Sequence, residues 1–450
     1  MKKYENLKET QTMFGSIPAH WELKRGKDVI SILSGFPFAS ELFDIDPATG
    51  FPLIRIRNVV TGTTDTYYKG DVLPEYVINA GDILIGMDGD YNCAIWNSEP
   101  ALLNQRVCKV DGKNGLLSKY LFYSLPFHLQ VINDLTYFTT VKHLSTHDIK
   151  NIVLPVPPVE EQRVIAAYLD RKTAQLDTLL AQKEALLLKL QQKRQALINE
   201  AVTQGLNPAA PRKPSGVAWL GEVPAHWEVK RLKQLTTKIG SGVTPLGGAE
   251  VYQDKGVPLF RSQNIYSDGL RLDDVAFVTE EVHESMKNSQ VEIGDVLLNI
   301  TGASIGRCYF YQGENKRANV NQHVCIIRPN EQVTTEYLQL VLASNLGQHQ
   351  IDMSQNGASR EGLTFSQLKE FRIPCPAIAE QQVLVQTINL RLQKISGAST
   401  AIRTQVRTLK AFRQSLISEV VTGKVDVRPT ASAAAPDRSR PTVVQTSLFN

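Results

Sequence analysis

The sequence has few of the features that mark a secreted, membrane-bound or disulfide-linked protein. Only five cysteines occur in 450 residues and no two of them form a Cys-x-x-Cys pair, which is typical of a chain that folds in a reducing compartment. No run of eighteen apolar residues is present, so no membrane span is expected. The first residues are polar and lack the apolar stretch of a signal peptide. We therefore expect a soluble, cytoplasmic protein.

Motifs for catalysis are also missing. No P-loop pattern for a nucleoside triphosphate occurs. The triplets that start at Glu22 and Glu228 resemble the last part of a metal-dependent nuclease motif, but no aspartate precedes Glu22, and the nearest before Glu228 is Asp177. His143 and His147 are four residues apart, a spacing that could bind a metal on a helix, but we interpret them as two ordinary polar residues. We expect no catalytic residue and no bound metal.

The composition is that of an ordinary globular protein. Apolar residues make up 42% of the chain and charged residues 21%, and the length suggests two to four domains. The net charge of +4 is compatible with a nucleic-acid partner without demonstrating one.

What the sequence does contain is a long internal duplication. The matched segments are Ile17–Arg25 with Val223–Arg231, Gly50–Asn58 with Gly256–Asn264, Gly81–Leu84 with Gly294–Leu297, Asn104–Cys108 with Asn321–Cys325, and Leu144–Gln162 with Leu363–Gln381. The offset grows only from 206 to 219 residues, as small loop insertions would produce. Two like halves in one chain predict a pseudo-twofold arrangement.

Each half has the same internal order. A strand-rich block comes first, because short apolar runs alternate with Gly, Asp and Asn. A proline-rich hinge follows, and then a long helix. The expected boundaries are 1–154 for the first block, 155–206 for its hinge and helix, 207–222 for a linker, 223–373 for the second block, 374–425 for its hinge and helix, and 426–450 for a disordered tail.

Pro-Ala-His-Trp-Glu is the longest run of residues repeated without change. We expect Trp21 and Trp227 to be buried anchors of the two blocks, with His20 and His226 as polar neighbours, rather than binding residues. Cysteines at matching places of the two halves fall in apolar strand patterns and are predicted to be core residues.

Two proline-free stretches, 169–201 and 388–420, carry apolar residues at alternating steps of four and three. This heptad spacing is typical of helices that wind around one another, because a narrow apolar seam needs a partner helix. Each helix would be roughly 50 Å long at about 1.5 Å per residue. The alternative is an ordinary amphipathic helix on a globular domain. The expected interface residues are Leu169, Leu176, Leu180, Leu187, Leu190 and Leu197 in the first helix, and Ile388, Leu392, Ile395, Ile402, Val406, Leu409 and Leu416 in the second.

Polar residues gather in the loops beside the predicted strands. Arg, Asn and Gln side chains bind guanine and adenine edges in the DNA major groove, and hydroxyl and basic residues suit phosphate contacts. The alternative for each single residue is a solvated loop. The candidate DNA-binding residues are Arg55, Arg57, Asn58, Arg106, Thr139, Thr140 and Lys142 in the first half, and Arg261, Gln263, Asn264, Gln322, Ser359 and Arg360 in the second.

The order of these features resembles the specificity subunit of Type I restriction–modification systems. That family has two divergent blocks, each followed by a Leu/Ile-Pro-x-Pro…Glu-Gln hinge and a long helix. The repeated Pro-Ala-His-Trp-Glu openings match it, and so do Glu161-Gln162, Glu380-Gln381 and the segment Thr173–Leu176 of the first helix. The resemblance extends over about residues 4–426.

The resemblance implies an α+β fold with two pseudo-symmetric, strand-rich target recognition domains joined by two long helices in an antiparallel coiled coil. Each domain would read one half of a split, asymmetric site in double-stranded DNA. The chain would have no catalytic activity and bind no cofactor itself; S-adenosylmethionine, ATP and Mg²⁺ would bind to its partners, two methyltransferase subunits and the restriction/translocase subunits. The alternative is a non-catalytic protein-binding scaffold with a coiled-coil strut.

Overall fold

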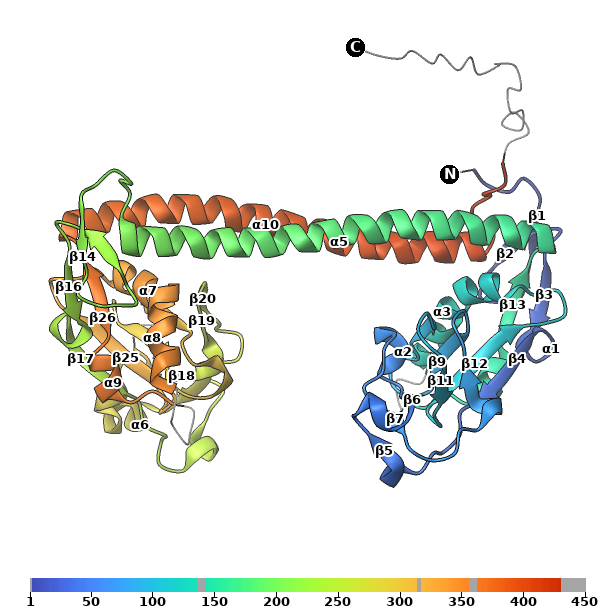
Figure 1. The fold of residues 1–450 in the computed structure, drawn as a ribbon, viewed down its shortest axis with the longest axis horizontal. Coiled ribbons are helices and arrows are strands. Elements are labelled where there is room, and N and C mark those ends of the chain that lie inside the picture. The colour runs from blue at the N-terminus through green and yellow to red at the C-terminus, as the bar shows by residue number, and fades with distance from the viewer. Residues whose placement is uncertain (1, 136–141, 314–316, 356–361, 430–450) are drawn as a thin grey trace, which may run out of the picture. The chain divides into compact units, whose positions relative to one another are not determined.

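The computed structural model describes residues 2–135, 142–313, 317–355 and 362–429 (Figure 1). The chain divides into two compact units. Unit 1 contains Met1–Gln182 and Gln405–Asn450, and unit 2 contains Lys183–Thr404. Each unit therefore holds one strand-rich block and a part of both long helices. The boundaries expected from the sequence, which separate the blocks from the helices, stay a prediction.

Unit 1 is built around a four-stranded antiparallel sheet in the order β10-β9-β12-β4. A second sheet, in the order β5-β7-β6-β11-β8, contains the parallel pair β6 and β11. The strands are β1 (Leu7–Glu9), β2 (Ser16–Pro18), β3 (Glu22–Arg25), β4 (Ile30–Ser34), β5 (Phe43–Asp44), β6 (Phe51–Ile54), β7 (Tyr67–Tyr68), β8 (Val77–Ile78), β9 (Ile83–Gly86), β10 (Cys93–Ile95), β11 (Ala101–Leu103), β12 (Val107–Gly112) and β13 (Val153–Val156). The helices confined to this unit are α1 (Gly26–Val29), α2 (Asn58–Thr61), α3 (Ser118–Leu135) and α4 (Thr146–Asn151).

Unit 2 repeats this plan. Its four-stranded antiparallel sheet has the order β23-β22-β25-β17, and β18 and β24 form the parallel pair. The strands are β14 (Arg212–Pro214), β15 (Glu222–Pro224), β16 (Glu228–Arg231), β17 (Thr236–Ser241), β18 (Val257–Phe260), β19 (Ile265–Tyr266), β20 (Gly269–Leu270), β21 (Ala276–Val278), β22 (Val296–Asn299), β23 (Cys308–Phe310), β24 (Asn319–Val320), β25 (Val324–Pro329) and β26 (Arg372–Cys375). The helices confined to it are α6 (Glu280–Ser285), α7 (Thr335–Ala343), α8 (Asn345–Gln355) and α9 (Phe365–Lys369).

The two long helices are α5 (Val159–Gln204) and α10 (Ile378–Val421), and within each unit they run side by side in opposite directions (Figure 1). Burial along both helices follows the four–three spacing of the seam. Between residues 174 and 193 of α5, and between 389 and 415 of α10, every seam position is shielded at least in part and every other position is exposed. In unit 1, Arg413 of α10 also donates to Asp177 of α5, with its Nε 2.8 Å from Oδ1.

The core of each unit takes in the end of the helix that starts in the other half of the sequence. In unit 1, Leu416 and Val420 of α10 belong to the same buried cluster as Trp21. In unit 2, Ile198 and Val202 of α5 belong to the cluster of Trp227. Both tryptophans are fully buried, as their expected role as anchors requires.

The segment expected to be a linker, 207–222, is in part a strand. Residues Arg212–Pro214 form β14, which pairs with β15 just as β1 pairs with β2 at the start of the chain. The linker prediction was made from the proline and alanine content, but proline is tolerated in an edge strand of this kind. The duplication therefore begins earlier than the sequence matches indicate.

The expected tail also begins too early. Asp426 has only 1% of its side chain exposed, and it pairs with Lys2 at 3.3 Å. Its backbone N–H donates to the Lys2 carbonyl at 2.9 Å. Burial opposes ionisation of Asp426, but hydrogen bonds from Arg428 and Lys2 prevail and lower its pKa to about 2. Residues 430–450 lie outside the described part of the chain.

No helix in the described residues has the length and apolar character that a membrane span requires.

Candidate functional site

Polar side chains surround the ends of the parallel strands in unit 1. Leu103 of β11 pairs with Ile54 of β6, so the residues that follow these strands emerge at one edge of the sheet. Arg55 and Arg57 follow β6, and both are exposed. The Nη2 atom of Arg57 lies 2.6 Å from the Asp65 carboxylate. We call the set Arg55, Arg57, Asp88, Gln105, Arg106, Lys142 and His143 the first rim.

Asp88 links the first rim together. It follows β9, and its Oδ1 lies 2.7 Å from Nδ1 of His143. Its Oδ2 lies 3.3 Å from Nη1 of Arg106. More than half of the Arg106 side chain remains exposed. The structure therefore places the predicted Arg106 beside two residues that the sequence analysis did not select for this role.

Unit 2 has an equivalent edge where β18 and β24 end. The side chains around it, Arg261, Gln263, Thr301, Gln322 and His323, form what we call the second rim. The guanidinium of Arg261 donates to the Asp274 carbonyl at 3.0 Å, and Gln263 donates to the Asp274 carboxylate. Gln322 is exposed, and its Nε2 lies 3.0 Å from Nε2 of His323.

Two predicted DNA-binding residues are buried instead. Asn58 is 4% exposed and Asn264 is 1% exposed. The Oδ1 of Asn58 accepts from the Arg55 N–H at 2.9 Å, and that of Asn264 accepts from the Arg261 N–H at 2.9 Å. Both asparagines hold the turn after a strand, so the prediction that they contact bases is wrong. Short polar side chains bond to nearby backbone, and this use competes with a surface role.

Four further candidates, Thr139, Thr140, Ser359 and Arg360, lie outside the described residues. Lys142 is half-buried, and its Nζ donates to Oδ1 of Asn133 at 2.5 Å.

The repeated histidine meets the glutamate of the hinge in both units, whereas the repeated tryptophan bonds this glutamate only in unit 2. In unit 1, His20 Nε2 lies 2.7 Å from a Glu161 oxygen, and Tyr4 donates its hydroxyl proton to the other oxygen at 2.6 Å. Burial and this bond raise the pKa of Tyr4. In unit 2, His226 and Trp227 occupy the two oxygens of Glu380, at 2.8 and 3.0 Å.

The glutamine beside each glutamate is completely buried. Gln162 accepts from the Leu117 N–H at 2.8 Å and donates to the Pro157 carbonyl at 2.9 Å. Gln381 makes the same pair of bonds with Thr334 and Pro376, at 2.8 and 2.9 Å. The Glu-Gln motif thus ties the start of each long helix to the block that precedes it. Its role is structural.

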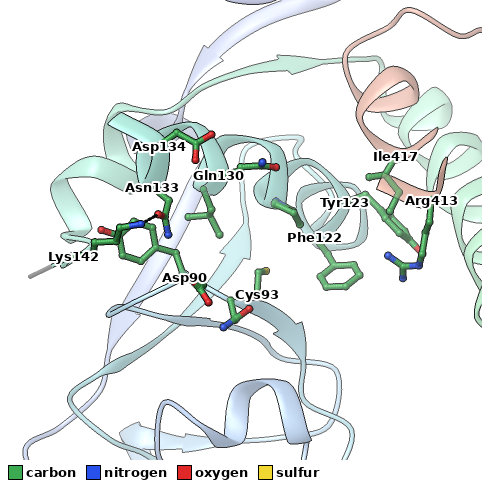
Figure 2. A pocket seen from close by; sticks show the side chains of 14 residues that line it. Asp90, Cys93, Phe122, Tyr123, Gln130, Asn133, Asp134, Lys142, Arg413 and Ile417 are labelled. Carbon is green, nitrogen blue, oxygen red and sulfur yellow. Dashed lines mark hydrogen bonds between the residues drawn. The ribbon is translucent and has the colours of Figure 1, made fainter. Parts of the chain in front are cut away.

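A cavity of about 620 Å³ in unit 1 lies between α3, the turn before β10 and the C-terminal part of α10 (Figure 2). Carboxylates of Asp90 and Asp134 and the cations of Lys142 and Arg413 line it, with Phe122 on the wall between them. The cavity shares Lys142 with the first rim. Its polar lining differs from the apolar pocket typical of a small-molecule site.

Several of the cysteines are buried in the cores. Burial raises the pKa of Cys108, Cys308 and Cys325 to about 12, so these side chains stay protonated at neutral pH. In the described residues, no three His, Cys, Asp or Glu side chains gather closely enough to hold a metal ion. What the rims offer is hydrogen bonding from exposed cations, amides and imidazoles.

A family model described as the Type I restriction modification DNA specificity domain matches residues 18–189 and 224–396. The chain belongs to this family. The model matches once in each half, as the duplication requires. The specificity subunit of the Type I restriction enzyme EcoBI from Escherichia coli is 32% identical over 423 residues, which cover 91% of this chain and 87% of that protein. The corresponding subunit of MjaVIII from Methanocaldococcus jannaschii is 24% identical over 95% of this chain and 97% of its own.

A solved structure agrees with the fold of this specificity subunit. It is described as the structural basis underlying complex assembly and conformational transition of the type I R-M system, and it matches with a TM-score of 0.67 at 17% identity. The match covers 91% of this chain and 99% of the other. Together with the family model, it confirms the predicted α+β class, with repeated strand-rich domains and long helices. The relatives are named as specificity subunits, in line with the predicted non-catalytic role.

Asp88, His143 and Thr301 of this specificity subunit are rim residues that were not predicted from the sequence. His143 belongs to the segment 139–143 that suits phosphate contact, but it was not among the candidate DNA-binding residues. The signal that could have found Asp88 is positional: it stands seven residues after Gly81 of a repeated segment, as Thr301 stands seven after Gly294.

Proposed function

We propose that this specificity subunit reads a split, asymmetric site in double-stranded DNA, with one half-site contacted by each rim. The observation that carries the proposal is that one backbone frame is built twice and presents different side chains each time. The rims share an arginine and a glutamine at matching places, Arg55 with Arg261 and Gln105 with Gln322. They differ where Arg57 and Arg106 of the first rim are matched by Gln263 and His323 of the second. Arginine pairs with guanine and glutamine with adenine in the major groove, so unlike rims select unlike sequences.

The long helices act as the spacer in this proposal. Half-sites on one face of DNA lie about one helical turn, roughly 34 Å, apart. A pair of continuous helices is stiffer than a linker of the same length and is suited to keep two readers in register. The helix pair and the domains together recruit two methyltransferase subunits, which bind S-adenosylmethionine, and through them the restriction/translocase subunits, which use ATP and Mg²⁺.

Random-site selection with the full-length chain tests the proposal. Purified protein, alone and co-expressed with the methyltransferase of its own operon, is mixed with duplexes that contain a randomised segment. The expected result is enrichment of two short conserved blocks separated by a fixed number of unselected base pairs. Enrichment of one uninterrupted block, or of nothing in either preparation, would overturn the proposal, and the latter result favours a protein-binding scaffold.

A further inference from the structure

The first rim rests on a backbone frame that fixes Asp88 from both sides. The N–H of Met87 donates to the Arg106 carbonyl at 3.0 Å, and the N–H of Leu144 donates to the Met87 carbonyl at 2.7 Å. Asp88 and His143 face each other in an antiparallel bridge. The carboxylate is thereby held between the two residues that it bonds, and its direction does not depend on a flexible loop.

The same frame occurs in unit 2 with other side chains. The N–H of Ile300 donates to the His323 carbonyl at 3.0 Å, and Thr301 and Gly362 face each other in the equivalent bridge. By position along this frame, Thr301 replaces Asp88, His323 replaces Arg106, and Gly362 replaces His143. A shared frame that carries unlike polar groups is what a reader of unlike sequences needs.

The chemistry of Asp88 determines which atoms its neighbours present outward. An ionised carboxylate only accepts hydrogen bonds, so Nδ1 of His143 must donate to it at 2.7 Å. The neutral ring then presents Nε2 as an acceptor. Arg106 uses one Nη1 hydrogen toward the carboxylate. Its remaining N–H groups have no partner in the described part of the chain and can form a two-pronged contact.

In unit 2, the rim side chains Gln322 and His323 are oriented without a carboxylate. The Oγ1 of Thr301 lies 2.6 Å from Nδ1 of His323. The amide of Gln322 donates to Nε2 of the same ring at 3.0 Å, which makes Nδ1 the protonated nitrogen. Both ring nitrogens of His323 are therefore occupied within the protein, and Gln322 is the outward-facing group.

We propose that Asp88 is a positioning residue for DNA recognition: it orients Arg106 toward a guanine and sets His143 to accept from a base amine in the same half-site. In the second domain, His323 takes the place of Arg106 and bonds to Gln322, and Gln322 selects adenine. This inference rests on the proposed function. It adds the identity of the residue that positions the base-reading group, and the base that each domain selects with that group. It is limited to one position of each half-site.

The test compares Asp88→Asn with wild type in random-site selection with the full-length chain. We expect Asp88→Asn to lose about tenfold in preference at one guanine of one half-site. Arg106→Ala should lose preference at the same position. The other half-site should be unchanged, because its reader stands on the second rim. Asp88→Glu retains the carboxylate and should recover a part of the lost preference, which a merely structural defect would not.

Glu75→Gln is the matched control, since it removes a carboxylate charge from an exposed residue of the same domain and leaves the first rim intact. It should select the wild-type motif. If Asp88→Asn does not fold, Arg106→Lys keeps the charge and removes the planar fork, and it should lose the same guanine preference. An unchanged motif for Asp88→Asn or Arg106→Lys, or an equal loss in both half-sites, would overturn the role of Asp88. Selection of no split motif by the wild-type chain would instead overturn the proposed function itself.

Discussion

Unit 1 and unit 2 share their frame and differ at their edges. The four-stranded sheets have the same order, the buried tryptophan and the hinge glutamine recur, and each core takes in the end of a long helix. The rims, in contrast, carry Asp88, Arg106 and His143 in unit 1 and Thr301 and His323 in unit 2. Duplication has kept the residues that hold the domains together and changed several of those that stand at the strand ends. This pattern separates stability from recognition within one molecule.

A second difference lies in the turn before an edge strand of each main sheet, β10 in unit 1 and β23 in unit 2. Gly306 has a left-handed backbone in unit 2, and Tyr91 has the same conformation in unit 1 with φ of 49°. Bulky residues rarely adopt this conformation, because it costs on the order of 1–3 kcal/mol. Tyr91 is 1% exposed, and its hydroxyl has no hydrogen-bond partner in the described residues. The two turns therefore differ in strain although they occupy equivalent places.

Among the substitutions that compare the two units, the largest effect is expected at the glycines that follow the long helices. Gly423 and Gly205 both have φ of 73°. A Cβ at Gly423 would lie 2.3 Å from Cδ of Pro18, whereas at Gly205 its nearest neighbour would be Trp227 at 3.2 Å. Alanine should lower the free energy of unfolding by about 3 kcal/mol at 423 and by about 1–2 kcal/mol at 205. Both positions force alanine into a left-handed backbone conformation, and only at 423 does its Cβ also clash with the rigid ring of Pro18.

Hydrogen exchange of the full-length chain, followed by mass spectrometry, measures both losses separately. Gly423→Ala should speed exchange around Trp21, and Gly205→Ala should speed it around Trp227. Equal losses of protection in the two variants, or a loss in the unit that was not changed, would contradict this prediction.

Substitution of the hinge glutamates should give a smaller difference in stability between the two units. The side chain of Glu161 is 7% exposed and that of Glu380 is 32% exposed. Glutamine in place of either one removes the negative charge that strengthens these hydrogen bonds, and this cost is larger where water cannot replace them. We expect Glu161→Gln to destabilise unit 1 by about 2 kcal/mol and Glu380→Gln to destabilise unit 2 by about 1 kcal/mol. Urea unfolding of the two variants should show this order, and the reverse order would contradict it.

The regular features of the fold could be predicted from the sequence. The heptad spacing and the duplication are repeated patterns, and such patterns can be recognised in a sequence without knowledge of which residues are in contact. Asp88 could not be found in this way, because its partners are 18 and 55 residues away and only the fold brings them together. Asn58 and Asn264 were wrongly selected because the same side chain can close a turn or bind adenine. The strand at 212–214 was missed since edge strands tolerate the composition of a linker.

Exchange of one recognition block tests the central claim most directly. Residues 17–154 are replaced by the equivalent block of the EcoBI specificity subunit, the 32% identical relative, and the DNA site of the chimaera is determined by random-site selection. If each domain reads its own half-site, one half of the motif changes and the other half keeps its sequence. A change in both halves, or in neither, would contradict the account.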